Sequence, residues 1–279
     1  MLRRTFLLAA GFALAATGLA QGLPSAAAED SFIVVQSTTS TQNSGLFDHI
    51  LPMFKEKTGI EVRVVAVGTG QAIRLAEHGD ADVLLVHHKP SELKFVAAGY
   101  GVKRFDLMYN DFVVIGPAAD PARVAGAKGA VDAMQRIAQV RAPFASRGDD
   151  SGTNKKEREL WRAAGIDATA ESGRWYRELG AGMGATLNTA AAMDAYTLSD
   201  RGTWLSFRNR GDLKLLYAGD PMLFNQYGVT VVNPEKFPHV KAKLAQSFVD
   251  WLLSPEGQQT IASYRVDGQQ LFFPNAAGS

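Results

Sequence analysis

The sequence predicts an α/β protein with two lobes, each built on a mainly parallel sheet flanked by helices. Strand-like and helix-like segments alternate from residue 31 onward. Several strand candidates are near-continuous apolar runs, such as ADVLLVHH at 81–88, as is typical of parallel strands buried on both faces. A β-α-β-α-β order implies a parallel sheet with right-handed crossovers.

The first part of the chain shows this alternation clearly. Strands are predicted over 31–37, 60–67, 81–88 and 106–117, and helices over 44–59, 68–80 and 91–99. In the first helix, Leu46, Ile50 and Phe54 fall on one face, which predicts an amphipathic helix packed on a sheet. Gly59 follows this run and predicts its end.

The middle of the chain, from about 131 to 207, has a more helical pattern. Helices are predicted over 131–140, 153–165, 186–205, 239–254 and 254–264, and strands over 213–218 and 227–234. No Gly/Ser/Pro-rich linker separates two halves, so we expect the chain to cross twice between lobes. The predicted lobes are residues 29–112 plus 226–279, and residues 113–225.

The N-terminal stretch has the pattern of an export signal. Arg3 and Arg4 precede an apolar run from about residue 6 to 20, and Ala26, Ala27 and Ala28 close it. We predict a cleavable signal peptide over 1–28 and a periplasmic mature protein. The arginine pair favours the twin-arginine export route over the general one, although paired arginines are common in basic leaders.

Composition and charge exclude several classes of function. Hydrophobic residues are 46% and charged residues 20% of the 279, which is an ordinary globular composition. The formal net charge of +1 gives no electrostatic case for a nucleic-acid partner. The chain has no cysteine, so neither disulfides nor a lipid-bearing cysteine is expected. An exported enzyme or a solute-binding protein remains.

Three loops rich in hydroxyl groups and glycine are the candidate site. They are Ser37 to Thr41, the Gly68, Thr69, Gly70 turn, and Ser146 to Asn154, which contains Arg147. Each follows a predicted strand and opens a predicted helix, where ligands bind in open α/β sheets. Any one such segment is more often an ordinary helix cap, but backbone N–H groups and hydroxyls in three of them, one with Arg147, predict a shared anion site.

Other chemistries lack their motifs. Position 73 is Ile, so the glycines at 68 and 70 do not complete a dinucleotide fingerprint, and neither a P-loop nor a G-x-S-x-G motif occurs. His87 and His88 are adjacent on a strand and point to opposite faces, so no metal site is predicted. We also expect no cofactor. Asp149 and Asp150 are interpreted as serving the helix start rather than as an acid/base pair.

The segments STTSTQNSGL, VGTGQA, SRGDDSGTNKKE and GMGATLNTA with AYTLSDRGTWL resemble the TupA family, tungstate-binding periplasmic proteins of ABC-type importers. The resemblance spans about 31–207. It implies a two-lobed, type II-like periplasmic binding protein that closes on a tetrahedral oxoanion in the cleft between its lobes, works as a monomer and delivers the anion to a membrane permease. It assigns the anion to Thr38, Thr39, Ser40 and Arg147, with donors from Ser151, Gly152 and Thr153; the Gly68, Thr69, Gly70 turn is the weakest part of the motif.

The chemistry of these residues agrees with that assignment. Tungstate carries no proton at neutral pH, so all its oxygens accept hydrogen bonds, and a site made of donors suits it. Arg147 adds charge-assisted bonds. Asp149 and Asp150 must then point away, with a role in orienting Arg147 or its loop. We expect the loop at 37–41 to form one jaw and the Arg147 loop the other.

Two alternatives stay open. Molybdate, sulfate or phosphate is the first, and donor counting does not separate tungstate from molybdate; phosphate carries a proton and would need an acceptor. A periplasmic phosphatase-like hydrolase with a loop serine is the second. It would need a base, and no histidine is near the hydroxyl-rich loops in sequence.

Overall fold

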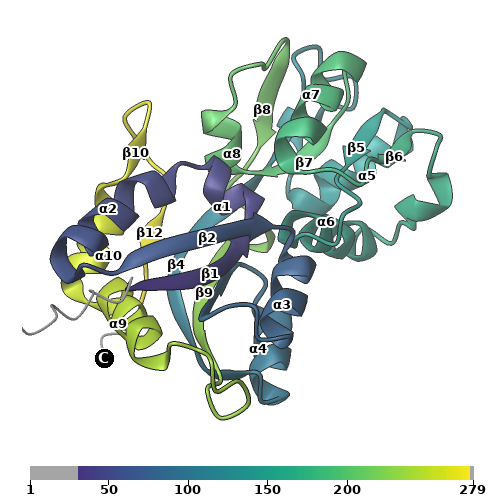
Figure 1. The fold of residues 1–279 in the computed structure, drawn as a ribbon. Helices are drawn as coiled ribbons and strands as arrows, with labels where there is room; N and C mark the ends of the chain where they lie inside the picture. The colour runs from purple at the N-terminus through teal and green to yellow at the C-terminus, as the bar shows by residue number, and fades with distance from the viewer. Residues whose placement is uncertain (1–30, 277–279) are drawn as a thin grey trace, which may run out of the picture. The chain divides into compact units, whose positions relative to one another are not determined.

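The computed structural model describes residues 31–276 (Figure 1). The predicted signal peptide at 1–28 lies outside the described residues. The strands are β1 (Phe32–Thr38), β2 (Glu61–Val67), β3 (Val83–Val86), β4 (Gly101–Pro117), β5 (Phe144–Ser146), β6 (Tyr176–Glu178), β7 (Thr197–Asp200), β8 (Leu213–Tyr217), β9 (Phe224–Val232), β10 (Arg265–Val266), β11 (Gln269–Gln270) and β12 (Phe273–Pro274). The α-helices are α1 (Thr39–Asn43), α2 (Leu46–Thr58), α3 (Thr69–Glu77), α4 (Lys89–Ala97), α5 (Ala130–Gln139), α6 (Gly152–Ala163), α7 (Met183–Met193), α8 (Arg201–Ser206), α9 (Ala242–Leu253) and α10 (Pro255–Ser263). Short 3-10 helices are η1 (Val124–Gly126), η2 (Ala168–Glu171) and η3 (Pro221–Leu223).

The main sheet is mixed, and its strand order is β12-β4-β9-β3-β1-β2. β1 pairs in parallel with β2 and β3, whereas β9 lies between β3 and β4 and is antiparallel to both. β2, β1, β3 and β4 therefore run the same way. The predicted α/β class is confirmed; the sheet is mixed because β9 returns against the others and β12 adds an antiparallel edge.

The long strand β4 takes part in two sheet regions. Up to Asp111 it pairs with β9, and from Phe112 onward it pairs with β7 and then β8, both antiparallel. β5 is parallel to β6 and forms a parallel bridge to Tyr196, just before β7. The change of partner at Phe112 falls where the sequence predicts the first crossing between lobes.

The apolar residues form three clusters that fix these elements. The largest packs α2, α9 and α10 on β1, β3 and β9 through residues such as Phe54, Phe248 and Trp251. A second lies around Trp161 and Tyr176 in the region of α5 and α6, and a third around Phe95 between α3 and α4. Burial of these faces is the main force that holds the helices on the sheet.

Most predicted elements are present, with one clear error. The predicted helix over 186–205 is in fact α7, then β7, then α8. Asp194 adopts a left-handed conformation (φ +50°) and ends α7, and the backbone of 197–200 pairs with β4. At Gly59, φ is +73° and the residue caps the C-terminus of α2, as predicted. Among the described residues, no helix combines the length and apolar character needed to cross a membrane.

Candidate functional site

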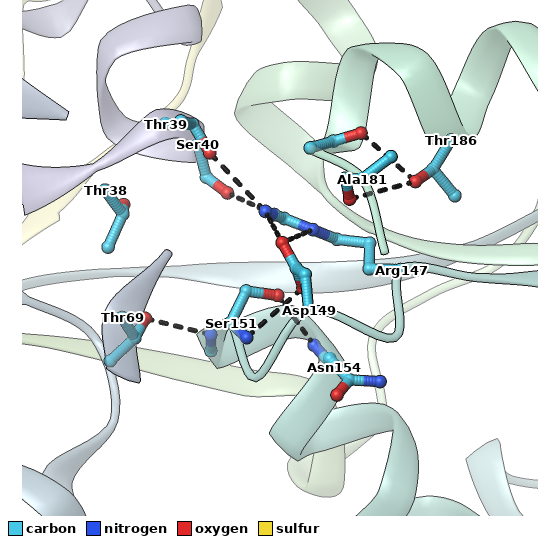
Figure 2. A network of polar contacts seen from close by, with 12 residues as sticks. Thr38, Thr39, Ser40, Thr69, Arg147, Asp149, Ser151, Asn154, Ala181 and Thr186 are labelled. Atoms are coloured by element: carbon cyan, nitrogen blue, oxygen red, sulfur yellow. Dashed lines mark hydrogen bonds and ion pairs between the residues drawn. The ribbon is translucent and has the colours of Figure 1, made fainter. Parts of the chain in front are cut away.

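The three predicted loops meet at the carboxyl ends of their strands (Figure 2). β1 leads into α1, β2 into α3, and β5 into α6. Hydrogen bonds join the loop at 37–41 to the loop at 146–154, and join the turn at 68–70 to the same loop. Loops far apart in sequence therefore form one polar cluster. The strands β1 and β2 are neighbours in the main sheet, whereas β5 belongs to a separate sheet with β6.

Arg147 lies at the centre of this cluster and is only 2% exposed. Its Nη1 donates to Ser40 Oγ over 3.2 Å, and its Nη2 donates to Thr39 Oγ1 over 3.4 Å. Its Nε and Nη2 also donate to Asp149 Oδ2, over 3.2 and 2.6 Å. These four contacts leave one of the five guanidinium N–H groups without a protein acceptor among residues 31–276.

The two aspartates of this loop have different roles. Asp149 holds Arg147 through Oδ2 and accepts the Ser151 backbone N–H through Oδ1, so it orients both the guanidinium and the start of α6. Asp150 is half exposed and forms ion pairs with Arg74 and Lys155. The interpretation that both carboxylates serve the loop agrees with these contacts.

The second contact between loops depends on close backbone approach. The Gly152 N–H donates to Thr69 Oγ1 over 2.9 Å, and the Gly70 N–H donates to the Asp150 carbonyl over 3.3 Å. A Cβ at Gly152 would lie 2.8 Å from Cε1 of His87 and 3.1 Å from the Thr69 hydroxyl. A side chain at 152 would therefore push the loops apart.

The hydroxyl groups of these loops can still donate a hydrogen bond to a further acceptor. Four of them accept an N–H from Arg147 or from the backbone, namely those of Thr39, Ser40, Thr69 and Ser151. Thr153 is 1% exposed, and its hydroxyl has no hydrogen-bond partner within the described part of the chain. A hydroxyl that accepts from the protein still has its own O–H to donate, so the cluster is a set of donors around one cation.

Thr38 differs from these residues, although the sequence groups it with them. Its Oγ1 accepts the Thr41 backbone N–H over 3.2 Å and caps α1. It also lies 2.8 Å from Thr41 Oγ1 and 3.2 Å from His87 Nε2. The Thr38 hydroxyl is thus occupied within the protein.

A buried chain of polar side chains, which the sequence pattern does not reveal, lies beside the loops. It runs from His87 through Asn225 and Asn110 to Tyr227, with His87 Nδ1 3.0 Å from Asn225 Oδ1. The sequence raises His87 only as a metal ligand, yet His87 follows β3, which is parallel to β1, so it lies at the same end of the sheet as the loop at 37–41. The rule that ligands bind beyond the carboxyl ends of parallel strands therefore also indicates His87. Burial lowers the pKa of His87 to about 4.

A buried acid, Asp200, ends β7 near this cluster. Its Oδ1 accepts the Thr203 N–H and caps α8. Burial raises its pKa, and the nearby charge of Arg147 opposes that shift. No group of three or more His, Cys, Asp or Glu in the described ranges is arranged to hold a metal ion.

The sheet order and the donor site at its edge are those of a substrate-binding protein. A family model, described as PBP superfamily domain, matches residues 23–256. The TupA protein of Peptoclostridium acidaminophilum, named a tungstate-binding protein, is 48% identical over 249 residues, covering 88% of this chain and 86% of that protein. The TupA of Campylobacter jejuni is 34% identical over 241 residues, covering 85% and 88%.

Solved structures agree with this assignment. The tungstate-binding protein TupA of Desulfovibrio alaskensis G20 is 47% identical, with a TM-score of 0.75 over 88% of this chain and 99% of that one. A protein described as the tungstate ABC transporter of Geobacter sulfurreducens is 50% identical, with a TM-score of 0.77 over 84% and 98%. The chain belongs to the TupA family, and the predicted resemblance is confirmed.

Proposed function

We propose that this protein is the substrate-binding component of an ABC importer, which captures the tungstate oxoanion and delivers it to a membrane permease. The names of its relatives support tungstate as the ligand. The observation that carries the proposal is the orientation of the loop hydroxyls. Their oxygens accept from Arg147 and from backbone N–H groups, which leaves their protons for an anion.

In this proposal Arg147 supplies a charged hydrogen-bond donor, and Thr39, Ser40, Thr69, Ser151 and Thr153 supply neutral donors. Because Asp149 already balances Arg147, the bound dianion is held largely by hydrogen bonds rather than by net charge. Donors in a site with little water contribute more than they would in solution. Gly68, Gly70 and Gly152 allow the loops to approach each other.

We further propose that residues 29–112 plus 226–279 and residues 113–225 are lobes that close on the anion. The change of β4 partners at Phe112 supports this boundary. The protein would act as a monomer in the periplasm after removal of a signal peptide at 1–28, and would have no catalytic activity, resident metal or cofactor.

The competing anions differ from tungstate in protonation state and in size. Phosphate at neutral pH carries a proton and needs an acceptor, whereas the hydroxyls of these loops already accept N–H groups and Asp149 Oδ2 accepts two from Arg147. Sulfate is smaller than tungstate. Molybdate is nearly the same size and remains the strongest competitor.

One observation favours the hydrolase alternative. Folding brings His87 within 3.2 Å of the Thr38 hydroxyl, with Asn225 behind the ring, which is the order of a nucleophile, a base and an orienting group. Thr38 is only 2% exposed, however, and its oxygen also accepts the Thr41 N–H, so it is poorly placed to attack a substrate.

A thermal-shift series with tungstate, molybdate, sulfate and phosphate tests the proposal. A ligand at a thousand times its Kd stabilises the folded state by about 4 kcal/mol. Tungstate should give the largest shift, with no turnover of generic phosphate esters. A tungstate shift no larger than that of sulfate, or clear ester hydrolysis, would overturn it.

A further inference from the structure

His87 touches two of the loops that form the site. It lies just after β3, is 4% exposed, and stacks on Tyr227 with ring centroids 4.8 Å apart. Its Nε2 faces Thr38 in the loop at 37–41, and its Cε1 approaches Gly152 at the start of α6.

The Thr38 hydroxyl has no capacity left for a ligand. A hydroxyl donates one proton and accepts through two lone pairs. Thr38 Oγ1 has three partners: the Thr41 N–H, the Thr41 hydroxyl and His87 Nε2. If His87 accepts the Thr38 proton, the Thr41 hydroxyl donates to Thr38; if His87 donates, Thr38 donates to Thr41. Both arrangements use the proton and both lone pairs.

The polar side chains that continue from His87 Nδ1 determine which of these two arrangements is present. Asn110 Nδ2 donates to the Tyr227 hydroxyl over 3.4 Å, and Asn225 Nδ2 donates to Asn110 Oδ1 over 2.6 Å. The remaining amide oxygen, Asn225 Oδ1, therefore accepts from His87 Nδ1. Since burial keeps the pKa of His87 near 4, the ring is neutral at pH 7, and Nε2 has a lone pair.

We propose that His87 is a positioning residue for the anion site: its Nε2 accepts the Thr38 hydroxyl proton and fixes the start of α1, while Thr38 itself does not contact the anion. The anion then takes its hydroxyl donors from Thr39 and Ser40, which the fixed turn presents beside Arg147. This inference rests on the proposed function.

A set of variants at His87 and Thr38 tests this role by tungstate titration calorimetry, well below their melting temperatures. In His87→Gln, the side-chain carbonyl can replace Nε2 as the acceptor, so affinity should stay within about threefold; His87→Leu has no acceptor and should weaken binding about tenfold, the scale of one hydrogen bond. Adding His87→Leu to Thr38→Val should cause no further loss, because both changes remove the same interaction. Affinity losses that multiply, or a His87→Leu protein that binds like wild type, would overturn the proposal.

The tautomer gives a second readout that needs no variant to fold. In ¹⁵N-histidine-labelled wild-type protein, long-range ¹H–¹⁵N correlations should place the ring proton of His87 on Nδ1, with and without tungstate. A proton on Nε2 would overturn the proposal. Failure of wild-type protein to bind tungstate would instead refute the proposed function, and the tautomer result would still stand.

Discussion

Two buried arginines show what distinguishes a binding group from a structural one. The side chains of Arg147 and Arg104 are 2% and 4% exposed. Arg104 donates to two carboxylates, Glu92 over 2.5 Å and Asp106 over 2.5 Å. Arg147 has one carboxylate and otherwise contacts neutral hydroxyls. The two carboxylates beside Arg104 disfavour an added anion, whereas Arg147, with a single carboxylate and neutral hydroxyls beside it, still has an N–H group to offer one.

Arg147→Ala should cause the largest change in ligand binding. Arg147 has one N–H left for the anion, and such a charge-assisted hydrogen bond contributes about 1.5–3 kcal/mol, so tungstate affinity should fall by about 10- to 100-fold. Titration calorimetry measures it. Arg147→Ala with Asp149→Asn is the matched control, because it leaves no unpaired carboxylate. Unchanged affinity in both variants would remove Arg147 from the site.

Arg104→Ala should instead reduce stability. Removing one partner of a buried ion pair costs about 3–5 kcal/mol. Urea unfolding measures this loss, and tungstate affinity of the folded protein should fall much less than in Arg147→Ala. Arg104→Met combined with Glu92→Leu should recover much of the stability. The comparison fails if Arg104→Ala weakens tungstate binding as strongly as Arg147→Ala.

Glu157 extends the comparison of Arg147 with Arg104 to a buried acid, because its hydrogen-bond partners are all neutral. The hydroxyls of Ser146 and Tyr176 and the Trp161 Nε1 donate to it, and they join the strand before Arg147 to α6. Burial raises its pKa from 4.5 to about 7. The folded state therefore binds this proton more tightly than the unfolded state does.

The stability of wild type relative to Glu157→Gln should thus be greatest below pH 4.5 and fall as pH rises through about 7. The total change is up to about 3 kcal/mol. Urea unfolding at several pH values measures it. Glu159→Gln is the control with the opposite sign, because hydrogen bonding to His88 lowers the pKa of Glu159 to about 2, so its contribution is lost as pH falls. A flat difference between wild type and Glu157→Gln would contradict this reading.

Asp150→Asn should have the smallest effect. Asp150 is exposed and pairs with Lys155 and Arg74 at the surface, where ion pairs contribute about 0–1 kcal/mol. Tungstate affinity should change by less than about threefold. A loss comparable to that of Arg147→Ala would mean that Asp150 acts in the site.

The sequence could predict the elements whose cause is local or periodic. The strand at 81–88 and the helix ended by Gly59 follow from apolar runs and a glycine cap. The strand β7 could not be recognised because its short run, Thr197–Asp200, lies between α7 and α8 and owes its conformation to pairing with β4. Such pairing between distant segments leaves no local pattern.

The candidate site likewise has one part that the sequence could predict and one part that it could not. Strand ends and hydroxyl-rich loops predicted which segments meet, and Arg147 indeed contacts Thr39 and Ser40. The contact of the Thr38 hydroxyl with His87 was not predictable, because the two residues are 49 positions apart in sequence. Composition shows that hydroxyls are present; only the fold shows which groups each hydroxyl meets.

Tungsten anomalous diffraction from crystals grown with tungstate tests the central claim most directly. The account predicts one tungsten peak beside the Arg147 guanidinium, with oxygens within hydrogen-bond distance of the Thr39 and Ser40 hydroxyls. A peak elsewhere, or an anion that contacts neither Arg147 nor these hydroxyls, would contradict it.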